Sequence, residues 1–125
     1  MIRILLAEDD ASMRGYLARA LERSGYKVDA VDRGTAALPR VKPGAYDLLL
    51  TDIVMPEMDG IELAQKAALV DPDMRVMFIT GFAAVALRAG AKPPQAKVLS
   101  KPFHLRDLVA EVDRLFVTEE EHGRL

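Results

Sequence analysis

The sequence of 125 residues contains no cysteine, and this absence excludes three kinds of chemistry together. Without a thiol the chain can form no disulfide framework, no thiolate metal site and no cysteine nucleophile. An excess of basic residues is also missing, since 17 lysines and arginines stand against 19 acids for a net charge of −2. With no basic stripe along the chain, nucleic acid is not expected as a direct partner.

Long apolar runs are absent as well, because every uninterrupted apolar stretch is far shorter than a membrane span requires. Residues 1–3 lead directly into an apolar run that predicts a strand, and they do not have the pattern of a signal sequence. We therefore expect no membrane association and a cytoplasmic location. Half of the residues are apolar and 29% are charged, which is ordinary for a single domain with its own core.

Five short apolar runs predict β-strands, and segments of helical periodicity lie between them. The runs cover Arg3–Ala7, Lys27–Val31, Asp47–Thr51, Arg75–Ile79 and Lys97–Leu99. The first, third and fourth are apolar almost throughout, as expected for strands that are covered on both faces. Alternation of strands and helices with short loops predicts an α/β domain, in which a doubly wound parallel sheet carries helices on both faces.

Five helices are predicted, and three of them show an apolar stripe. The stripes consist of Met13, Tyr16, Leu17, Ala20 and Leu21, then Ile61, Ala64 and Ala68, and finally Leu105, Leu108, Val109, Val112 and Phe116. Gly25 suits the end of the first helix, and Asp59 with Glu62 has the spacing of a capping box before the second. Residues 34–42 predict a short or kinked helix, because Pro39 in a helix interior costs about 3 kcal/mol. Residues 82–89 predict a further helix.

Reactive side chains stand at the carboxyl ends of four predicted strands. In chain order they are Glu8, Asp9 and Asp10 after the first strand, Asp52 after the third, Thr80 after the fourth and Lys101 after the fifth. In an open parallel sheet, ligands bind beyond the carboxyl ends of the strands, where the winding reverses. We therefore expect three of these acids, Glu8, Asp9 and Asp52, to face a common crevice with one hydroxyl and one ammonium.

The chemistry of such a cluster favours a hard metal ion. Two carboxylates about 5 Å apart repel by roughly 3 kcal/mol at an effective dielectric constant near 20, so the acids require a cation. Carboxylates without histidine or thiolate neighbours make an oxygen-only site, which suits Mg²⁺. A metal ion and an ammonium around a carboxylate are the parts needed to carry that carboxylate through phosphoryl transfer.

Four motifs resemble those of bacterial response-regulator receivers, in the same order and over about residues 2–117. They are Ile4-Leu5-Leu6-Ala7-Glu8-Asp9-Asp10, Leu50-Thr51-Asp52-Ile53-Val54-Met55-Pro56 with Met58-Asp59-Gly60, Phe78-Ile79-Thr80-Gly81, and Ser100-Lys101-Pro102-Phe103. The resemblance implies a flavodoxin-like fold with five parallel strands in the order 2-1-3-4-5 and five helices. We expect the receiver domain to span residues 1–117, and residues 118–125, which include three consecutive glutamates, to form a flexible acidic tail.

The resemblance also implies the roles of the acidic residues. Asp52 would accept a phosphoryl group from a histidine kinase or a histidine phosphotransferase. Mg²⁺ would be bound by Asp9, by Asp52 and by the backbone carbonyl of Val54, with support from Glu8. A domain of this kind is a phosphoacceptor in signalling and not an enzyme.

Two further residues receive a role by the same resemblance, and a third departs from the family pattern. Thr80 would close on the phosphoryl group, and Lys101, followed by a cis bond to Pro102, would hold one of its oxygens. Many receivers carry tyrosine or phenylalanine three residues before this lysine, but this sequence has Val98. Since valine cannot act as an aromatic rotamer switch, we expect the signal to travel mainly through residues 81–90.

Two polar residues near the site have a simpler explanation. Asp10 offers a third carboxylate after the first strand, but its position directly before a predicted helix fits an N-cap better than a metal ligand. His104 occupies the corresponding position before the last helix, so a structural role is favoured over proton transfer.

Residues 80–87, 97–102 and 104–112 resemble the CpdR family of alphaproteobacterial single-domain receivers, which act as adaptors for the ClpXP protease. The resemblance implies that the unphosphorylated chain binds the protease and promotes degradation of cell-cycle regulators, and that a phosphorelay switches this off. Recruitment to a cell pole stays open. Because the sequence ends soon after the last predicted helix, we expect output through protein contacts, from a monomer or weak dimer.

Two functions of other classes remain open at this point. The chain could be a phosphorelay intermediate or phosphate sink, in which Asp52 passes its phosphoryl group to a histidine. It could also be a metal-dependent phosphohydrolase. Such enzymes usually place a second acid two residues after the nucleophile, and this position is Val54 here, which argues against that function.

Overall fold

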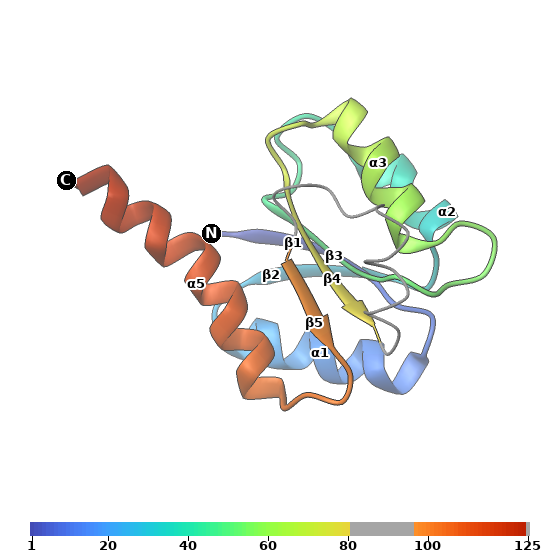
Figure 1. Ribbon diagram of the computed structural model, residues 1–125, viewed down its shortest axis with the longest axis horizontal. Coiled ribbons are helices and arrows are strands. Elements are labelled where there is room, and N and C mark those ends of the chain that lie inside the picture. The colour runs from blue at the N-terminus through green and yellow to red at the C-terminus, as the bar shows by residue number, and fades with distance from the viewer. Residues whose placement is uncertain (81–96, 125) are drawn as a thin grey trace.

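A single parallel sheet forms the centre of the molecule (Figure 1). The computed structural model describes residues 1–80 and 97–124, with residues 117–124 described by their backbone alone. The strands are β1 (Arg3–Ala7), β2 (Lys27–Val31), β3 (Leu48–Asp52), β4 (Arg75–Thr80) and β5 (Lys97–Ser100), and their order in the sheet is β2-β1-β3-β4-β5. The predicted fold and strand order are confirmed, and each strand boundary lies within one residue of its predicted position.

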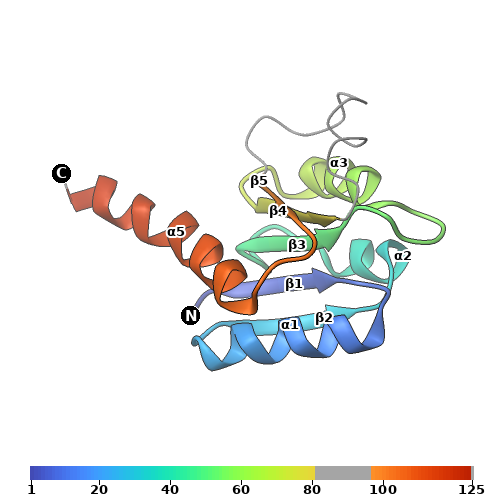
Figure 2. The same cartoon turned by 60° about the horizontal axis from the view of Figure 1, so that its bottom comes forward.

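Helices cover both faces of the sheet. They are α1 (Ala11–Arg23), α2 (Gly34–Ala37) with the following 3₁₀ helix η1 (Leu38–Arg40), α3 (Gly60–Val70) and α5 (Leu105–Arg124). Figure 2 shows α1 and α5 on one side of the sheet and α2 and α3 on the other. The helix predicted for residues 82–89, and the signalling route predicted through residues 81–90, lie outside the described residues.

Alternate residues of the central strands enter two separate apolar cores. On β1, Ile4 and Leu6 belong to the core beneath α1 and α5, whereas Leu5 and Ala7 belong to the core beneath α2 and α3. All four side chains are fully buried. The continuous apolar run of this strand therefore has a physical cause, since neither of its faces meets water.

The predicted helix ends are confirmed by their capping contacts. The side chain of Asp10 accepts a hydrogen bond from the backbone N–H of Met13 at 2.9 Å, and that of Asp59 accepts one from Glu62 at 2.7 Å. Each carboxylate satisfies an N–H group that has no partner within its own helix. At the other end of α1, Gly25 has a φ of 98°, a conformation that favours glycine.

Pro39 shortens the second helical segment, as predicted. The α-helical hydrogen bonds of α2 end at Ala37, and the chain continues as the tighter turn η1, which contains the proline. A proline has no N–H to donate, so the α-helical pattern cannot continue past this point without an unpaired carbonyl.

Two residues that were assigned to apolar stripes are exposed, and these assignments are wrong. The Tyr16 side chain of α1 is 55% exposed, and Ala68 of α3 faces solvent while its neighbour Ala67 is buried. Leu63, which the predicted stripe omitted, is fully buried as well. Helix α3 has apolar residues around much of its circumference, so periodicity alone could not identify its buried face.

The last helix is long and extends past the sheet. Its C-terminal turns project beyond the body of the molecule in both views (Figures 1 and 2). The helix includes residues 118–124 of the segment for which we expect a flexible tail, and a domain boundary at residue 117 stays a prediction. None of the helices in the described part of the chain combines the length and the apolar character that crossing a membrane requires.

Candidate functional site

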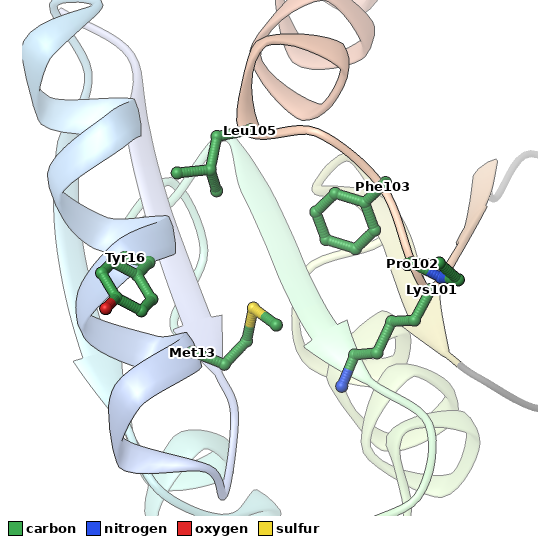
Figure 3. Close-up of a pocket in the computed structure, with 6 residues that line it drawn as sticks. All are labelled: Met13, Tyr16, Lys101, Pro102, Phe103 and Leu105. Carbon is green, nitrogen blue, oxygen red and sulfur yellow. The ribbon is translucent and has the colours of Figure 1, made fainter.

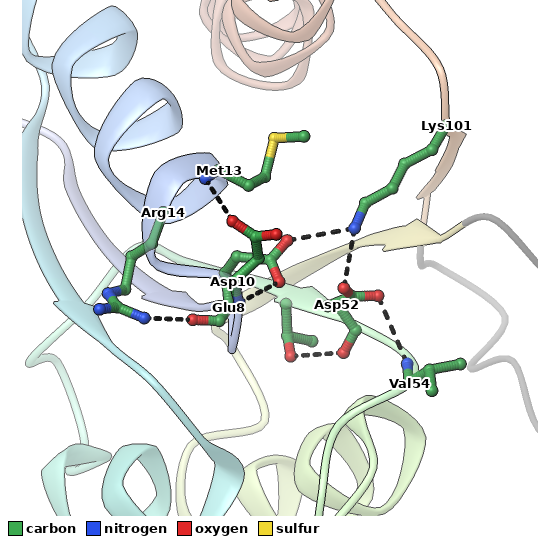
Figure 4. Close-up of polar contacts among 8 residues, drawn as sticks. Glu8, Asp10, Met13, Arg14, Asp52, Val54 and Lys101 are labelled. Carbon is green, nitrogen blue, oxygen red and sulfur yellow. Dashed lines mark hydrogen bonds and ion pairs between the residues drawn. The ribbon is translucent and has the colours of Figure 1, made fainter.

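The predicted site residues meet at the carboxyl edge of the sheet. Glu8 follows β1, Asp52 ends β3, Thr80 ends β4 and Lys101 follows β5. These four strands are neighbours in the sheet, so residues up to 93 positions apart in sequence come into contact. Figure 4 shows the Lys101 side chain reaching toward Glu8 and Asp52.

Three carboxylates form a compact acidic group at this edge. Glu8, Asp9 and Asp52 each offer one oxygen, and these oxygens all lie within 4.8 Å of one another. Glu8 and Asp52 are buried, with 0% and 6% exposure, whereas Asp9 is exposed. An oxygen-only donor set that opens to solvent through one member fits Mg²⁺, which keeps part of its water shell when bound. Asp10 does not belong to this group, consistent with its role as an N-cap.

Lys101 compensates part of this negative charge. Its ammonium donates to Asp52 Oδ2 at 2.9 Å and to Glu8 Oε1 at 3.3 Å. Burial by itself would lower the pKa of Lys101, but the hydrogen bond and charge of Asp52, together with Glu8, raise it. The side chain therefore stays protonated and bridges two acids. The peptide bond to Pro102 is cis, as predicted.

The balance of charges leaves Glu8 with an unusual proton affinity. The pKa of its carboxyl group is raised to about 7, mainly by burial and also by the nearby Asp52, against the opposing effects of the Asp10 N–H and Lys101. The Asp10 backbone N–H donates to Glu8 Oε2 at 3.2 Å. One ammonium thus does not fully compensate the cluster, and in the absence of a cation Glu8 exchanges a proton near neutral pH.

The backbone of Asp52 is held in place by the start of α3. A methyl group added at Gly60 would lie 2.1 Å from the Asp52 carbonyl oxygen, so only glycine fits there. The Gly60 N–H donates to the carbonyl of Ile53 at 2.8 Å, which fixes the approach. The Asp52 side chain is oriented by the Val54 N–H, 3.4 Å from Oδ1. Gly60 belongs to a recognised motif, but this steric requirement was not predicted.

Thr80 lies in register beside the strand that carries the lysine. It is fully buried, it pairs with Ser100, and its carbonyl accepts the Lys101 N–H at 2.8 Å. Val98 is half-buried, pairs with Phe78 and packs against the core beneath α2 and α3. The position that carries an aromatic ring in many receivers is thus occupied by a small side chain that is already part of the core.

Two residues at the site were missed by sequence reasoning. The Arg14 guanidinium donates to the Glu8 carbonyl at 2.9 Å, and the Thr51 hydroxyl donates to the Asp52 carbonyl at 2.9 Å. Both contacts hold the main chain beside an acidic residue and do not touch the carboxylates. The Arg14 contact depends on how α1 packs on the sheet, and the Thr51 contact depends on a side-chain rotamer, so no spacing rule signals either of them.

Comparison with known proteins identifies the family of this sequence. The sequence matches the response regulator receiver domain over residues 4–113. It is 59% identical, over 94% of this chain and 98% of the relative, to the response regulator receiver protein CpdR of Brucella abortus.

Solved structures give the same result. The receiver domain of the hybrid histidine kinase CckA has a TM-score of 0.78 and 32% identity, over 90% of this chain and 96% of that one. A response regulator receiver protein from Sinorhizobium medicae has a TM-score of 0.83 and 34% identity, over 91% and 93%. In sequence and in fold, the chain therefore belongs to the response regulator receiver family.

Proposed function

We propose that this chain is a stand-alone response regulator that takes up a phosphoryl group on Asp52. The observation that carries the proposal is the setting of this carboxylate, which is buried, paired with Lys101 at 2.9 Å and grouped with Glu8 and Asp9. Receiver domains generally bind Mg²⁺ at an acidic pocket and interact with kinases and phosphotransferases, and this chain has an acidic cluster of that composition. The phosphodonor is then a histidine kinase or a histidine phosphotransferase.

The acidic cluster is the proposed metal site. Asp9 and Asp52 would hold Mg²⁺ with the backbone carbonyl of Val54, and Glu8 would support them. When bound, the ion supplies positive charge that neutralises the acids and the oxygens of an incoming phosphoryl group. The exposure of Asp9 leaves the cluster accessible to solvent and to a donor.

Transfer to Asp52 exchanges one bond for another. A carboxylate oxygen of Asp52 forms a bond to phosphorus while the bond from phosphorus to the donor imidazole nitrogen breaks. The nitrogen keeps that electron pair and takes up a proton from solvent. Lys101 holds one phosphoryl oxygen and the Thr80 hydroxyl donates to another, because the aspartyl phosphate carries a charge of about −1.5 to −2 where the carboxylate carried −1. The residues around Asp52 bind and orient the group and do not need to exchange protons with it.

The output that we infer is control of proteolysis by protein contact. The 59% identity to CpdR over nearly the whole length of both chains supports a role as a phosphorylation-controlled adaptor for the ClpXP protease. The unphosphorylated form would bind the protease and promote degradation of its substrates, and phosphorylation would end the interaction. Such a role would be carried out in the cytoplasm, by a monomer or weak dimer, with recruitment to a cell pole as a further possibility to test.

A binding experiment tests the proposed output. Immobilised ClpXP is offered the unmodified chain, the Asp52→Ala variant, and both proteins after treatment with a phosphodonor and Mg²⁺. The unmodified chain and Asp52→Ala should bind, treatment should abolish binding of the wild type, and Asp52→Ala should not respond to it. Asp73→Ala removes an exposed acid that precedes β4, at the opposite edge of the sheet, and should behave as the wild type.

Other outcomes would assign a different function. Rapid return of the phosphoryl group to a phosphotransferase, with no protease binding in either state, would identify a relay intermediate or phosphate sink. Steady turnover of a generic phosphate ester would identify a phosphohydrolase.

Unfolding in urea tests the metal site independently of the output. Mg²⁺ should stabilise the wild-type chain by mass action. Asp52→Asn should unfold at higher urea than the wild type without metal, because three acids face a single ammonium, and it should gain less from Mg²⁺. Asp73→Asn serves as the control of equal charge change. A wild-type midpoint that is independent of Mg²⁺ would contradict the site.

A further inference from the structure

A pocket of about 480 Å³ opens beside the proposed phosphoacceptor site (Figure 3). It lies between α1 and the segment that leads from β5 into α5, and we name it the α1–α5 pocket. Its lining consists of Met13, Tyr16, Lys101, Pro102, Phe103 and Leu105. The lining is mainly apolar, and its volume lies in the range of pockets that accept a small ligand or a large side chain.

Two large apolar side chains of this pocket are exposed to solvent. Tyr16 is 55% exposed and Leu105 is 38% exposed. An aromatic ring this exposed loses little water contact on folding, and burial against a partner would explain its place beside the pocket. Exposed apolar residues that gather around a hollow are typical of interaction sites.

The charge around the pocket indicates the chemistry of such a partner. Helix α1 contains three arginines and one glutamate, although the whole chain has a net charge of −2. Arg19 is exposed and places its guanidinium carbon 5.5 Å from the centre of the Tyr16 ring, whereas the ammonium of Lys101 is already paired with Glu8 and Asp52. No acidic residue belongs to the lining. A partner segment with acidic residues beside an apolar one is therefore complementary to this surface.

Lys101 belongs to the pocket and to the phosphoacceptor site at once. Its aliphatic stem forms part of the pocket wall, while its ammonium contacts Asp52 and Glu8. Figure 3 shows the Lys101 side chain among the residues that line the pocket, and Figure 4 shows its contacts with Glu8 and Asp52. A group attached to Asp52 that draws the ammonium to a new position would thereby act on the side chain that lines the pocket.

We propose that the α1–α5 pocket is the docking point of the output partner. The partner inserts an apolar side chain from an acidic amphipathic segment into the pocket. Lys101 makes this docking depend on whether Asp52 is phosphorylated. The inference rests on the proposed adaptor function and names the surface that performs it. Docking requires the pocket wall as it stands when Lys101 pairs with Asp52, so the unphosphorylated chain is the binding form.

Surface variants test the docking point. Binding to immobilised ClpXP is measured for the unphosphorylated wild type, Tyr16→Ser, Leu105→Ser and Leu69→Ser. Leu69 is 87% exposed on α3, on the opposite face of the sheet, and is the matched control. Tyr16→Ser and Leu105→Ser should each weaken binding about tenfold or more, as loss of an anchor residue does, while Leu69→Ser binds as the wild type. Equal loss in all three variants would overturn the proposal.

A second measurement separates docking from folding and from phosphotransfer. Loading of Asp52 from a low-molecular-weight acyl phosphate needs no docked protein, so Tyr16→Ser and Leu105→Ser should load like the wild type. A variant that fails to load is misfolded, and the other variant then decides the result. Variants that keep protease binding but lose transfer from a histidine phosphotransferase would assign the pocket to the phosphodonor and overturn the proposal.

The methyl NMR signal of Met13 reports the pocket directly in the wild type. It should shift on protease binding and again on phosphorylation, and a signal that stays unchanged in both cases would refute docking and coupling. If the wild type binds ClpXP in neither state, the proposed function fails and the inference fails with it. If the wild type binds and Tyr16→Ser and Leu105→Ser bind equally well, the inference alone fails.

Discussion

Glu8 should give the metal-free chain a stability that decreases as the pH rises. Burial, with a further contribution from Asp52, raises the pKa of its carboxyl group from 4.5 to about 7 in the folded chain. Between these two values the folded chain retains a proton that the unfolded chain has released, so raising the pH favours unfolding. At about 1.4 kcal/mol for each pH unit, the interval corresponds to about 3 kcal/mol of free energy of unfolding. This contribution is fully present below 4.5 and is lost as the pH rises through about 7.

Urea unfolding in the presence of a chelator measures this effect. The free energy of unfolding is determined from about pH 5 to about pH 8 for the wild type and for Glu8→Gln, which cannot titrate at this position. Groups distant from the site titrate alike in both proteins, so the difference between the two curves reports Glu8 together with its coupling to Asp52 and Lys101. The wild type should lose about 2–3 kcal/mol relative to the variant across this range.

Magnesium should reduce the dependence of the free energy of unfolding on pH. The cation favours the ionised form of Glu8, so at saturating Mg²⁺ the wild type should lose less stability between pH 5 and pH 8 than it does without metal. The reasoning is refuted if the metal-free wild type and Glu8→Gln follow parallel curves, or if the wild type gains stability relative to the variant as the pH rises.

Three further predictions concern the fold. Gly60→Ala should destabilise the chain by about 1–3 kcal/mol, because the added methyl group meets the Asp52 carbonyl. Gly15→Ala should stabilise the chain by up to about 1 kcal/mol, because Gly15 lies in mid-helix and the atom nearest to the added methyl group is 3.7 Å away. Equal urea midpoints for the two variants would contradict this. Tyr26→Phe should cost about 1 kcal/mol in thermal unfolding, because the hydroxyl donates to a carboxylate of α5, and an unchanged midpoint would show that the contact contributes nothing. Limited proteolysis should remove residues 118–125 and leave a fragment ending near residue 117 with an unchanged melting temperature, while a fall in that temperature on trimming would place the boundary further along α5.

The sheet and the meeting of the site residues could be predicted from the sequence for a common reason. Strands covered on both faces must be apolar at every position, so β1, β3 and β4 stand out clearly in the sequence. In a parallel sheet all carboxyl ends lie at one edge, which brings Glu8, Asp52, Thr80 and Lys101 together whatever the details of the loops.

The contacts that depend on packing could not be predicted in this way. The exposure of Tyr16 depends on which residues of α1 the neighbouring elements cover, and the bridge from Lys101 to two acids depends on the path of the chain after β5. The steric demand at Gly60 is set by how closely α3 approaches β3. Periodicity records which residues share a face of one element, and it contains no information on the distance between two elements.

The tight contact at Gly60 determines the direction in which the domain can respond to modification. Because the main chain of Asp52 is pressed against the first residue of α3, it has no room to retreat when its side chain gains a bulky group. The added volume must be accommodated on the opposite side, by displacement of Lys101 and of the loops that follow β1 and β5. Because Gly60 has no side chain, α3 lies directly against the main chain of Asp52 and stays in place. Lys101 and the loops after β1 and β5 are therefore the parts of the site that move.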